Sequence, residues 1–231
     1  MSILSVNVSL PKVVEYRGGT VETGIFKDPV AGRVMMRTLN LDGDGQADLR
    51  VHGGRDKAVY VYSSDYYEYW KAELQRNDLP CGQFGENLTV EGLTDEVVRI
   101  GDVFRVGGAT VQVTQPRVPC YKLAIKMEDP AFPKRFLASR RMGFYVRVRA
   151  EGEIGVGDEF ELVERESEPL TVSDVVELAY FDRGNLDRAE AALRVKALPR
   201  SWRDEFEERL RRAGVTVAAE AVPDDRCGPS A

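Results

Sequence analysis

A proline-bounded segment, residues 115–122 (Gln-Pro-Arg-Val-Pro-Cys-Tyr-Lys), constrains the fold of this chain more than any other stretch. Residues 109–114 alternate apolar and polar side chains with a period of two, which predicts a strand with one buried face. Pro116 ends that strand because proline donates no backbone hydrogen bond, and Pro119 stiffens the next turn. The sequence therefore predicts a rigid loop that holds the thiol of Cys120 at a strand end.

The chemistry of that thiol depends on its charged neighbours. Arg117 and Lys122 flank Cys120, and nearby cations favour the thiolate, which is the form of cysteine that attacks electrophiles or binds metals. A free cysteine is also commonly a small, inert apolar residue. Both interpretations stay open on the loop sequence alone.

Composition and cysteine spacing exclude several classes of protein. The chain has 231 residues, 43% hydrophobic and 30% charged, which is typical of a globular protein, and its net charge of -6 argues against general nucleic-acid binding. The N-terminus lacks the basic and apolar segments of a signal peptide, and no apolar run approaches the roughly 20 residues that span a bilayer. The three cysteines, Cys81, Cys120 and Cys227, form no Cys-x-x-Cys pair, which excludes a zinc ribbon or an iron–sulfur cluster held by this chain alone. We expect a cytoplasmic protein, with no nucleic acid and no membrane among its partners.

Short strands separated by turns are expected through residue 163. Residues 100–104 (Ile-Gly-Asp-Val-Phe) and 156–160 (Val-Gly-Asp-Glu-Phe) are alike, and each predicts a Gly-Asp turn that enters a strand. A polar linker at residues 164–169 precedes three amphipathic helical segments. We expect a mainly β domain with short inserted helices at residues 1–165, a small three-helix bundle at 166–213 and a disordered tail at 214–231. The bundle is expected to contribute docking and no catalytic group, and its exposed face makes a homodimer plausible.

Three other stretches contain candidate site residues, and each has a structural alternative. Residues 43–48 (Gly-Asp-Gly-Gln-Ala-Asp) loosely resemble a calcium loop but lack its final glutamate, which favours a turn capped by aspartates. The only histidine precedes two glycines in His52-Gly53-Gly54, where the backbone either approaches a ligand closely or forms a turn. After Gly85, Glu86 and Asn87 present an acceptor and an amide that either read the edge of a heterocycle or cap their own turn.

Five segments, in this order, resemble motifs of the molybdenum cofactor sulfurase C-terminal (MOSC) family, and specifically its YiiM-like members with a C-terminal three-helix domain. They are residues 23–27 (Thr-Gly-Ile-Phe-Lys), 43–48, 51–54, 84–88 and 115–122. With the helical segments included, the resemblance covers about residues 3–212.

The resemblance implies a MOSC-type β-barrel that holds a pyranopterin molybdenum cofactor, with Cys120 as the thiolate ligand of molybdenum. Thiolate is a soft ligand suited to such a metal. The cations expected to pair with the cofactor phosphate are Lys27, Arg117, Lys122 and Arg147, and Arg117 and Lys122 are favoured as neighbours of the cysteine. The other cofactor-binding candidates are His52, Gly53, Gly54, Gly85, Glu86, Asn87, Gln115 and Tyr121.

The resemblance also implies an activity, the reduction of N-hydroxylated compounds to amines or amidines. Hydroxylaminopurine-type base analogues and amidoximes are the expected substrates. Two electrons and two protons release the oxygen as water, and the electrons are expected from a separate reductase, a flavin or iron–sulfur protein. Two alternatives stay open: a non-catalytic carrier of the cofactor or sulfur-transfer module, and a thiol-based redox sensor without a metal.

Overall fold

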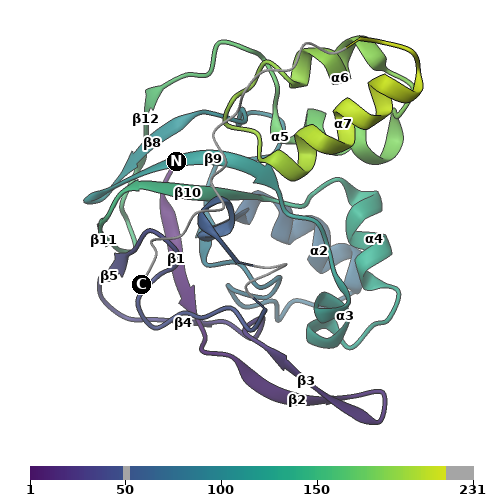
Figure 1. Cartoon of the computed structure of the whole chain (residues 1–231). Helices are drawn as coiled ribbons and strands as arrows, with labels where there is room; N and C mark the ends of the chain where they lie inside the picture. Colours follow the sequence, from purple (N-terminus) through teal and green to yellow (C-terminus); the bar gives the residue numbers. More distant parts are fainter. Residues whose placement is uncertain (49–52, 217–231) are drawn as a thin grey trace, which may run out of the picture.

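An eight-stranded sheet is the main sheet of the fold (Figure 1). The structure is a computed structural model, and it describes residues 1–48 and 53–216. The strands are β1 (Ile3–Val8), β4 (Asp28–Pro29), β6 (Val59–Ser63), β7 (Leu88–Val90), β8 (Val103–Val106), β9 (Ala109–Pro116), β10 (Phe144–Ala150) and β12 (Phe160–Glu164). They lie in the order β12-β8-β9-β10-β6-β7-β1-β4, and neighbours are antiparallel except for the parallel pair β6 and β7.

The sheet curls, but its ladder of strand pairs has two ends, β12 and β4. The start of the chain meets the start of β12 through an isolated bridge between Ser2 and Glu159. Beside it, the backbone N–H of Phe160 donates to the carbonyl of Met1 at 2.9 Å. The expected mainly β fold with short helices is confirmed, whereas strand pairing within the described ranges does not show a closed barrel.

Both Gly-Asp turns predicted from the sequence precede strands that pair with each other. The Asp102 carboxylate accepts a hydrogen bond from the backbone N–H of Arg99 at 2.9 Å, and the Asp158 carboxylate accepts one from Gly155 at 2.9 Å. In each turn the aspartate satisfies the amide three residues before it, which is the usual role of Asp in a tight turn. The two turns lead into β8 and β12, which are antiparallel neighbours.

Three helices pack around a cluster of buried rings beside the sheet. They are α2 (Tyr67–Leu74), α3 (Tyr121–Met127) and α4 (Phe132–Ser139), and α2 is preceded by the short turn η2 (Ser64–Tyr66). The Trp70 ring of α2 stacks on the Phe136 ring of α4 with centroids 5.4 Å apart, and Phe84 completes the contact at 5.7 Å from Phe136. This aromatic cluster fixes the loop that contains Gly85 against the helix that follows Cys120.

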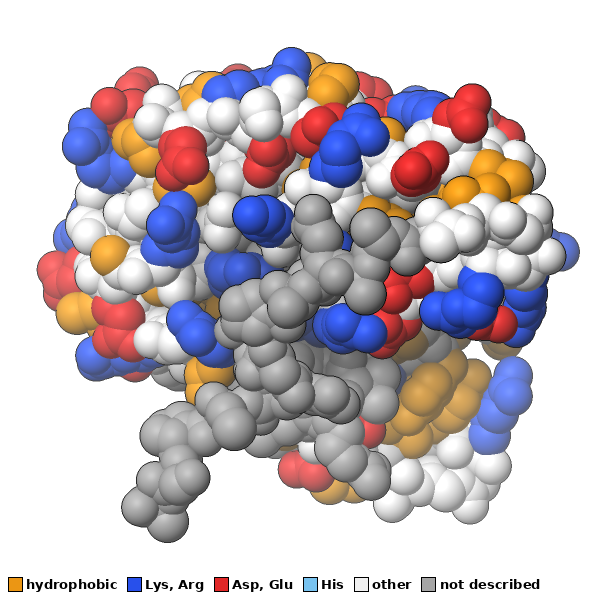
Figure 2. Space-filling model, turned by 45° about the horizontal axis from the view of Figure 1, so that its top comes forward, with side chains coloured by type: hydrophobic (Ala, Val, Ile, Leu, Met, Phe, Trp, Pro, Cys, Tyr) orange, Lys and Arg blue, Asp and Glu red, His pale blue; other side chains and the backbone are white. Residues whose placement is uncertain are grey.

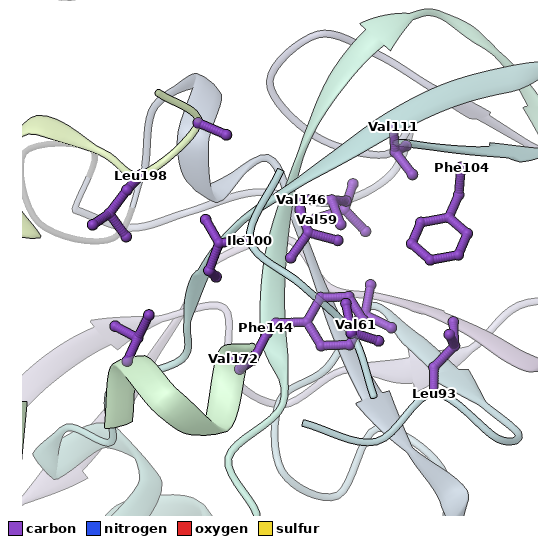
Figure 3. Close-up of a cluster of buried hydrophobic side chains, with 14 of the residues drawn as sticks. Val59, Val61, Leu93, Ile100, Phe104, Val111, Phe144, Val146, Val172 and Leu198 are labelled. Atoms are coloured by element: carbon purple, nitrogen blue, oxygen red, sulfur yellow. The ribbon is translucent and has the colours of Figure 1, made fainter. Parts of the chain in front are cut away.

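The C-terminal helical region is confirmed, and it shares its core with the sheet. Its elements are α5 (Val172–Val176), η3 (Glu177–Phe181), α6 (Leu186–Ala192) and α7 (Arg200–Arg212). Thr171 and Asp174 form a capping box that starts α5. Val172 and Leu198 lie in the same buried cluster as Val59 of β6 (Figure 3). The helices therefore stabilise the sheet directly, because they cover apolar side chains that would otherwise face water.

Two further strand pairs lie outside the main sheet. The hairpin β2 (Lys12–Tyr16) and β3 (Gly19–Thr23) projects away from the body of the molecule (Figure 1). The second pair joins β5 (Val34–Met36) to β11 (Gly152–Ile154). The hairpin matters for the site, because β3 ends directly at the segment that forms one wall of the cavity described below.

Charged side chains of both signs are interspersed over the face shown in Figure 2. Many charged side chains of the described residues form ion pairs, such as Arg33 with Asp158 at 2.8 Å and Arg194 with Glu168 at 2.8 Å. Exposed pairs of this kind contribute little to stability, typically about 0–1 kcal/mol. No helix in the described ranges is long and apolar enough to cross a bilayer.

Candidate functional site

A cavity opens beside Cys120, and we call it the Cys120 cavity. It encloses about 640 Å³ of empty space, part of it open to solvent. The residues that line it are Thr23, Gly24, Ile25, Lys27, Asp44, Gly45, Gln46, Ala47, Lys57, Tyr60, Gly85, Asn87, Arg117, Val118, Cys120, Lys122 and Tyr145.

Cys120 lies where the sequence predicted it, in a loop between the end of β9 and the start of α3. Its backbone is extended, with φ -125° and ψ 173°, and its carbonyl accepts the N–H of Leu123 at 3.0 Å. The residue is partly exposed and lines the cavity. A rigid loop thus presents one thiol to the cavity.

Arg117 is buried, with only 5% of its surface exposed. Its guanidinium carbon lies 5.5 Å from the centroid of the Tyr60 ring and 5.3 Å from that of the Phe136 ring. Its Nη1 atom is buried and has no hydrogen-bond partner among the described residues. A buried donor left without an acceptor costs about 1–3 kcal/mol, more when it is charged. Because Arg117 lines the cavity, this nitrogen is suited to an acceptor on a bound ligand.

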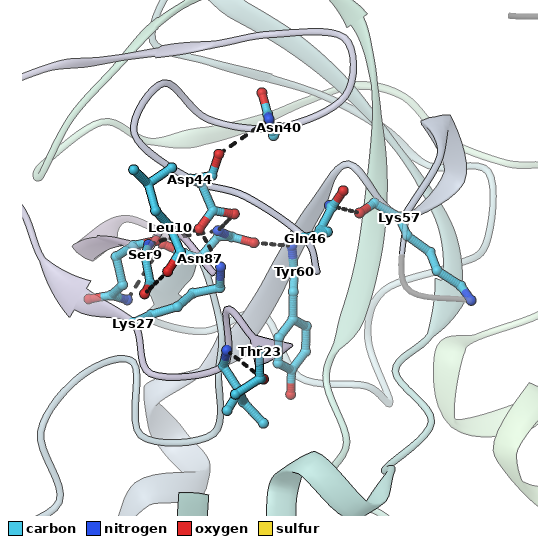
Figure 4. Close-up of polar contacts among 12 residues, drawn as sticks. Ser9, Leu10, Thr23, Lys27, Asn40, Asp44, Gln46, Lys57, Tyr60 and Asn87 are labelled. Carbon is cyan, nitrogen blue, oxygen red and sulfur yellow. Dashed lines mark hydrogen bonds and ion pairs between the residues drawn. The ribbon is translucent and has the colours of Figure 1, made fainter. Parts of the chain in front are cut away.

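Lys27 also lines the cavity, but Asp44 already neutralises its charge. Its Nζ atom lies 2.5 Å from Oδ1 of Asp44, which also accepts the N–H of Ser9 at 2.9 Å (Figure 4). The other oxygen of Asp44 accepts a hydrogen bond from Asn87 at 2.9 Å. Burial lowers the pKa of Lys27, and the charge of Asp44 opposes that shift. Asp44 therefore accepts a backbone N–H and pairs with Lys27. A backbone-capping role for the aspartates is what the turn interpretation of residues 43–48 predicted.

Close approaches between chain segments form part of the cavity wall. A side chain at Gly24 would place its Cβ 2.4 Å from the carbonyl oxygen of Gly45. A Cβ at Gly85, where φ is +85°, would lie 2.7 Å from Cγ1 of Ile25. Glycine is required at these positions because any larger residue would push the two segments apart.

Glu86 and Asn87 have different environments although they are adjacent. Asn87 lines the cavity, and its Oδ1 accepts the backbone N–H of Tyr60 at 3.1 Å. Glu86 is fully buried and does not line the cavity. Its carboxylate accepts hydrogen bonds from the amides of Gly82 at 2.9 Å and Phe84 at 3.0 Å. Burial raises the pKa of Glu86, and these donors oppose the shift, so its role is to hold the loop.

Gln115 and Arg147 also lie outside the cavity, and both connect the C-terminal helices to Asp56. The Gln115 side chain donates to the carbonyl of Asp56 at 3.1 Å and accepts the indole N–H of Trp202 at 3.0 Å. Arg147 pairs with Asp56 at 2.7 Å and donates to the carbonyl of Ala197 at 3.0 Å. Asp56 belongs to η1 (Arg55–Lys57), whose last residue lines the cavity. Gln115 and Arg147 therefore hold Asp56, and with it the neighbouring Lys57 of the cavity wall, without lining the cavity themselves.

Replacing Trp202 with phenylalanine should lower the free energy of unfolding by about 1–3 kcal/mol, because Oε1 of Gln115 loses a buried donor. Urea denaturation measures this change. Trp202→Phe keeps an aromatic ring in the apolar cluster, so the lost hydrogen bond is the main difference. An unchanged denaturation midpoint would show that the Gln115–Trp202 bond does not connect the two regions energetically.

Tyr121, Gly53 and Gly54 are not among the residues that line the Cys120 cavity. Tyr121 is 50% exposed, and its ring stacks on Tyr16 of the hairpin with centroids 6.1 Å apart. Gly53 and Gly54 precede η1, and Gly54 has a φ of +95°, as a glycine-dependent turn predicts. His52 lies outside the described residues. The structure thus brings six candidates together at the cavity: Lys27, Gly85, Asn87, Arg117, Cys120 and Lys122.

Lys57, Tyr60 and Tyr145 are cavity residues that lie outside all five motif segments and were not among the candidates. Burial lowers the pKa of Lys57, while Asp56 and Cys120 oppose the shift. Burial also raises the pKa of Tyr145 and Tyr60, so both phenols keep their protons. Lys57 follows the His-Gly-Gly segment by three residues, and that proximity was the only signal for it in the sequence.

Two family models match different parts of the chain. The model of the MOSC domain matches residues 48–161, and that of the YiiM-like, 3-alpha helix domain matches residues 170–213. A Gibberella moniliformis protein named "Reductase" is 36% identical over 151 residues, which are 64% of this chain and 27% of that protein.

Two relatives match over most of their length. YflK of Bacillus subtilis is 45% identical over 205 residues, which cover 89% of this chain and 92% of YflK. The crystal structure of YiiM from Geobacillus stearothermophilus superposes with a TM-score of 0.77 at 36% identity, covering 90% of this chain and 98% of that one. The chain therefore belongs to the YiiM-like family of MOSC-domain proteins.

Proposed function

We propose that this protein is a molybdenum-cofactor-dependent oxidoreductase that reduces N-hydroxylated compounds, hydroxylaminopurine-type bases and amidoximes, to amines or amidines. The observation that carries the proposal is the buried Nη1 of Arg117, which has no partner among the described residues and lines the same cavity as Cys120. A cationic group beside a single thiol is what a phosphate-bearing, thiolate-ligated cofactor requires. The relative named a reductase supports a redox activity for this fold.

The donor set of the cavity fits such a cofactor. Cys120 is a soft ligand, and no group of three or more His, Cys, Asp or Glu side chains that could hold a metal occurs within residues 1–48 and 53–216. A metal at Cys120 would therefore take its remaining ligands from a cofactor such as a dithiolene. Arg117 and Lys122 would hold the phosphate.

The reaction balances with two electrons and two protons. The N–O bond of R–NH–OH breaks, the nitrogen keeps its hydrogen and gains another, and the oxygen leaves as water. When bound, the molybdenum cofactor supplies the two-electron chemistry of this step. Tyr145, whose pKa is raised by burial, places a neutral phenol at the cavity wall that can orient a polar substrate, whereas the hydroxyl of Tyr60 already donates to the carbonyl of Met142 at 2.7 Å. A separate flavin or iron–sulfur reductase is proposed as the source of the electrons.

Turnover by the cofactor-loaded protein tests this function. Benzamidoxime and 6-hydroxylaminopurine are each supplied with a chemical electron donor, and amidine or adenine formation is followed. The expected result is multiple turnovers that require the protein. Cofactor bound at one per chain without turnover would favour the carrier alternative instead.

A further inference from the structure

Three lysines and one phenylalanine lie at the Cys120 cavity or next to residues that line it: Lys122, Lys126, Lys12 and Phe26. Lys122 lines the cavity, and Lys126 lies one turn further along α3 on the same face. The Nζ atom of Lys126 lies 5.2 Å from the centroid of the Phe26 ring, and that of Lys12 lies 4.6 Å from the same centroid. Phe26 stands between Ile25 and Lys27, which both line the cavity. We call Lys12, Phe26 and Lys126 the outer lysine patch.

The outer lysine patch gathers like charges without a fixed counter-ion. No carboxylate of the described residues lies within 4.0 Å of the ammonium groups of Lys12, Lys122 or Lys126. Burial lowers the pKa of Lys126, Lys12 and Lys27 add to that shift, and Glu86 and Asp28 oppose it. Contact with the Phe26 ring stabilises the two ammonium groups only modestly. A bound anion would relieve the repulsion between them.

The number of cations exceeds what one phosphate monoester needs. A phosphate monoester carries a charge between about -1.5 and -2 at neutral pH. Arg117 and Lys122 already supply two positive charges at the cavity wall. The two ammonium groups of the outer lysine patch are additional, although the chain as a whole has a net charge of -6. The excess indicates a second anionic group close to the first.

We propose that Lys12 and Lys126 form a second anion subsite at the edge of the Cys120 cavity, and that it binds the phosphate of the substrate. This inference rests on the proposed function and narrows it: the preferred substrates are N-hydroxylated nucleotides rather than free bases or nucleosides. The ammonium groups of Lys12 and Lys126 both lie near the Phe26 ring, and Phe26 and Lys126 are half-buried. Two cations held at one ring next to the cavity suit a phosphate that extends from a ligand in the cavity better than they suit the broad surface of an acidic protein.

Equilibrium binding of a matched ligand pair tests the subsite. Dissociation constants for N6-hydroxyadenosine and its 5′-monophosphate are measured by calorimetry on the full-length, cofactor-loaded protein. The wild type should bind the nucleotide at least about tenfold more tightly than the nucleoside, because a phosphate gains charge-assisted bonds. In Lys12→Gln/Lys126→Gln the ratio should fall towards one. The control Lys134→Gln/Lys196→Gln removes two exposed lysines remote from the cavity lining and should keep the wild-type ratio.

Three outcomes would overturn the subsite. The first is equal affinity of the wild type for nucleoside and nucleotide, and the second is a ratio that survives in Lys12→Gln/Lys126→Gln. The third is a double variant whose turnover slows only with a protein reductase while its binding ratio stays intact, which would make the patch a docking site for the electron donor. Failure of the proposed function is distinguishable, because neither ligand would then be reduced while the binding ratio still reports on the patch.

Discussion

Replacing Cys120 with serine is expected to lower the reduction of N-hydroxylated substrates by more than about a hundredfold. Even the loss of a partner that only supports a metal ligand commonly costs 10–100-fold, so loss of the ligand itself should cost more. A serine hydroxyl ionises far less readily than a thiol and is a hard ligand. Steady-state turnover with one electron donor, on variants loaded with cofactor, measures the effect.

The same substitution should leave the fold intact. Cys120 is partly exposed in an extended loop, and its side chain is not a member of either hydrophobic cluster. A near-isosteric change at such a position typically alters stability by about 0.5 kcal/mol or less. The controls are Cys81→Ser, at a residue that does not itself line the cavity, and Cys227→Ser, outside the described residues. Full activity of Cys120→Ser would remove the metal-ligand role, and equal inactivity of all three variants would indicate thiol redox chemistry.

The double variant Arg117→Met/Lys122→Gln is expected to bind the cofactor at least about a hundredfold more weakly. Each charge-assisted bond to phosphate contributes about 1.5–3 kcal/mol, and about 1.4 kcal/mol corresponds to a factor of ten. Methionine replaces arginine because Arg117 is 5% exposed between two rings, where an acidic side chain would bury an unpaired charge. Molybdenum per chain after exhaustive dialysis measures the loss.

A matched control separates loss of the phosphate contact from loss of aromatic packing. The guanidinium of Arg141 lies 4.0 Å from the centroid of the Tyr69 ring, and Arg141 does not line the Cys120 cavity. Arg141→Met removes a stacked cation and should retain wild-type molybdenum content. If the Arg117→Met/Lys122→Gln protein also retained it, the phosphate would have to bind elsewhere in the cavity.

Local sequence patterns were sufficient to predict the elements whose structure depends on neighbouring residues. Period-two alternation predicted β9, and the repeated Gly-Asp pair predicted the turns before β8 and β12. The prolines around Cys120 predicted its extended loop. Each of these features is determined within a few residues. In the turns a nearby backbone N–H donates to an aspartate side chain, and at the prolines the backbone lacks an N–H.

The roles of individual site residues depend on partners that are distant in the sequence. Gln115 is the first residue of the segment that contains Cys120, but its side chain binds Trp202, 87 residues away. Glu86 and Asn87 are adjacent, yet only Asn87 reaches the cavity. Lys27 was expected to meet a phosphate, whereas Asp44 already pairs with it. Residue type and motif membership therefore predicted where the cavity would form but not which side chains would face it.

The central claim is that the Cys120 thiolate is a ligand of molybdenum, and X-ray absorption at the molybdenum K edge tests it most directly. Spectra are compared for the wild-type protein and Cys120→Ser, each loaded with cofactor. The account predicts that the metal in the variant has one sulfur neighbour fewer, replaced by an oxygen or nitrogen, and that Cys81→Ser matches the wild type. Identical sulfur coordination in wild type and Cys120→Ser would contradict it, as would the absence of molybdenum from all three proteins.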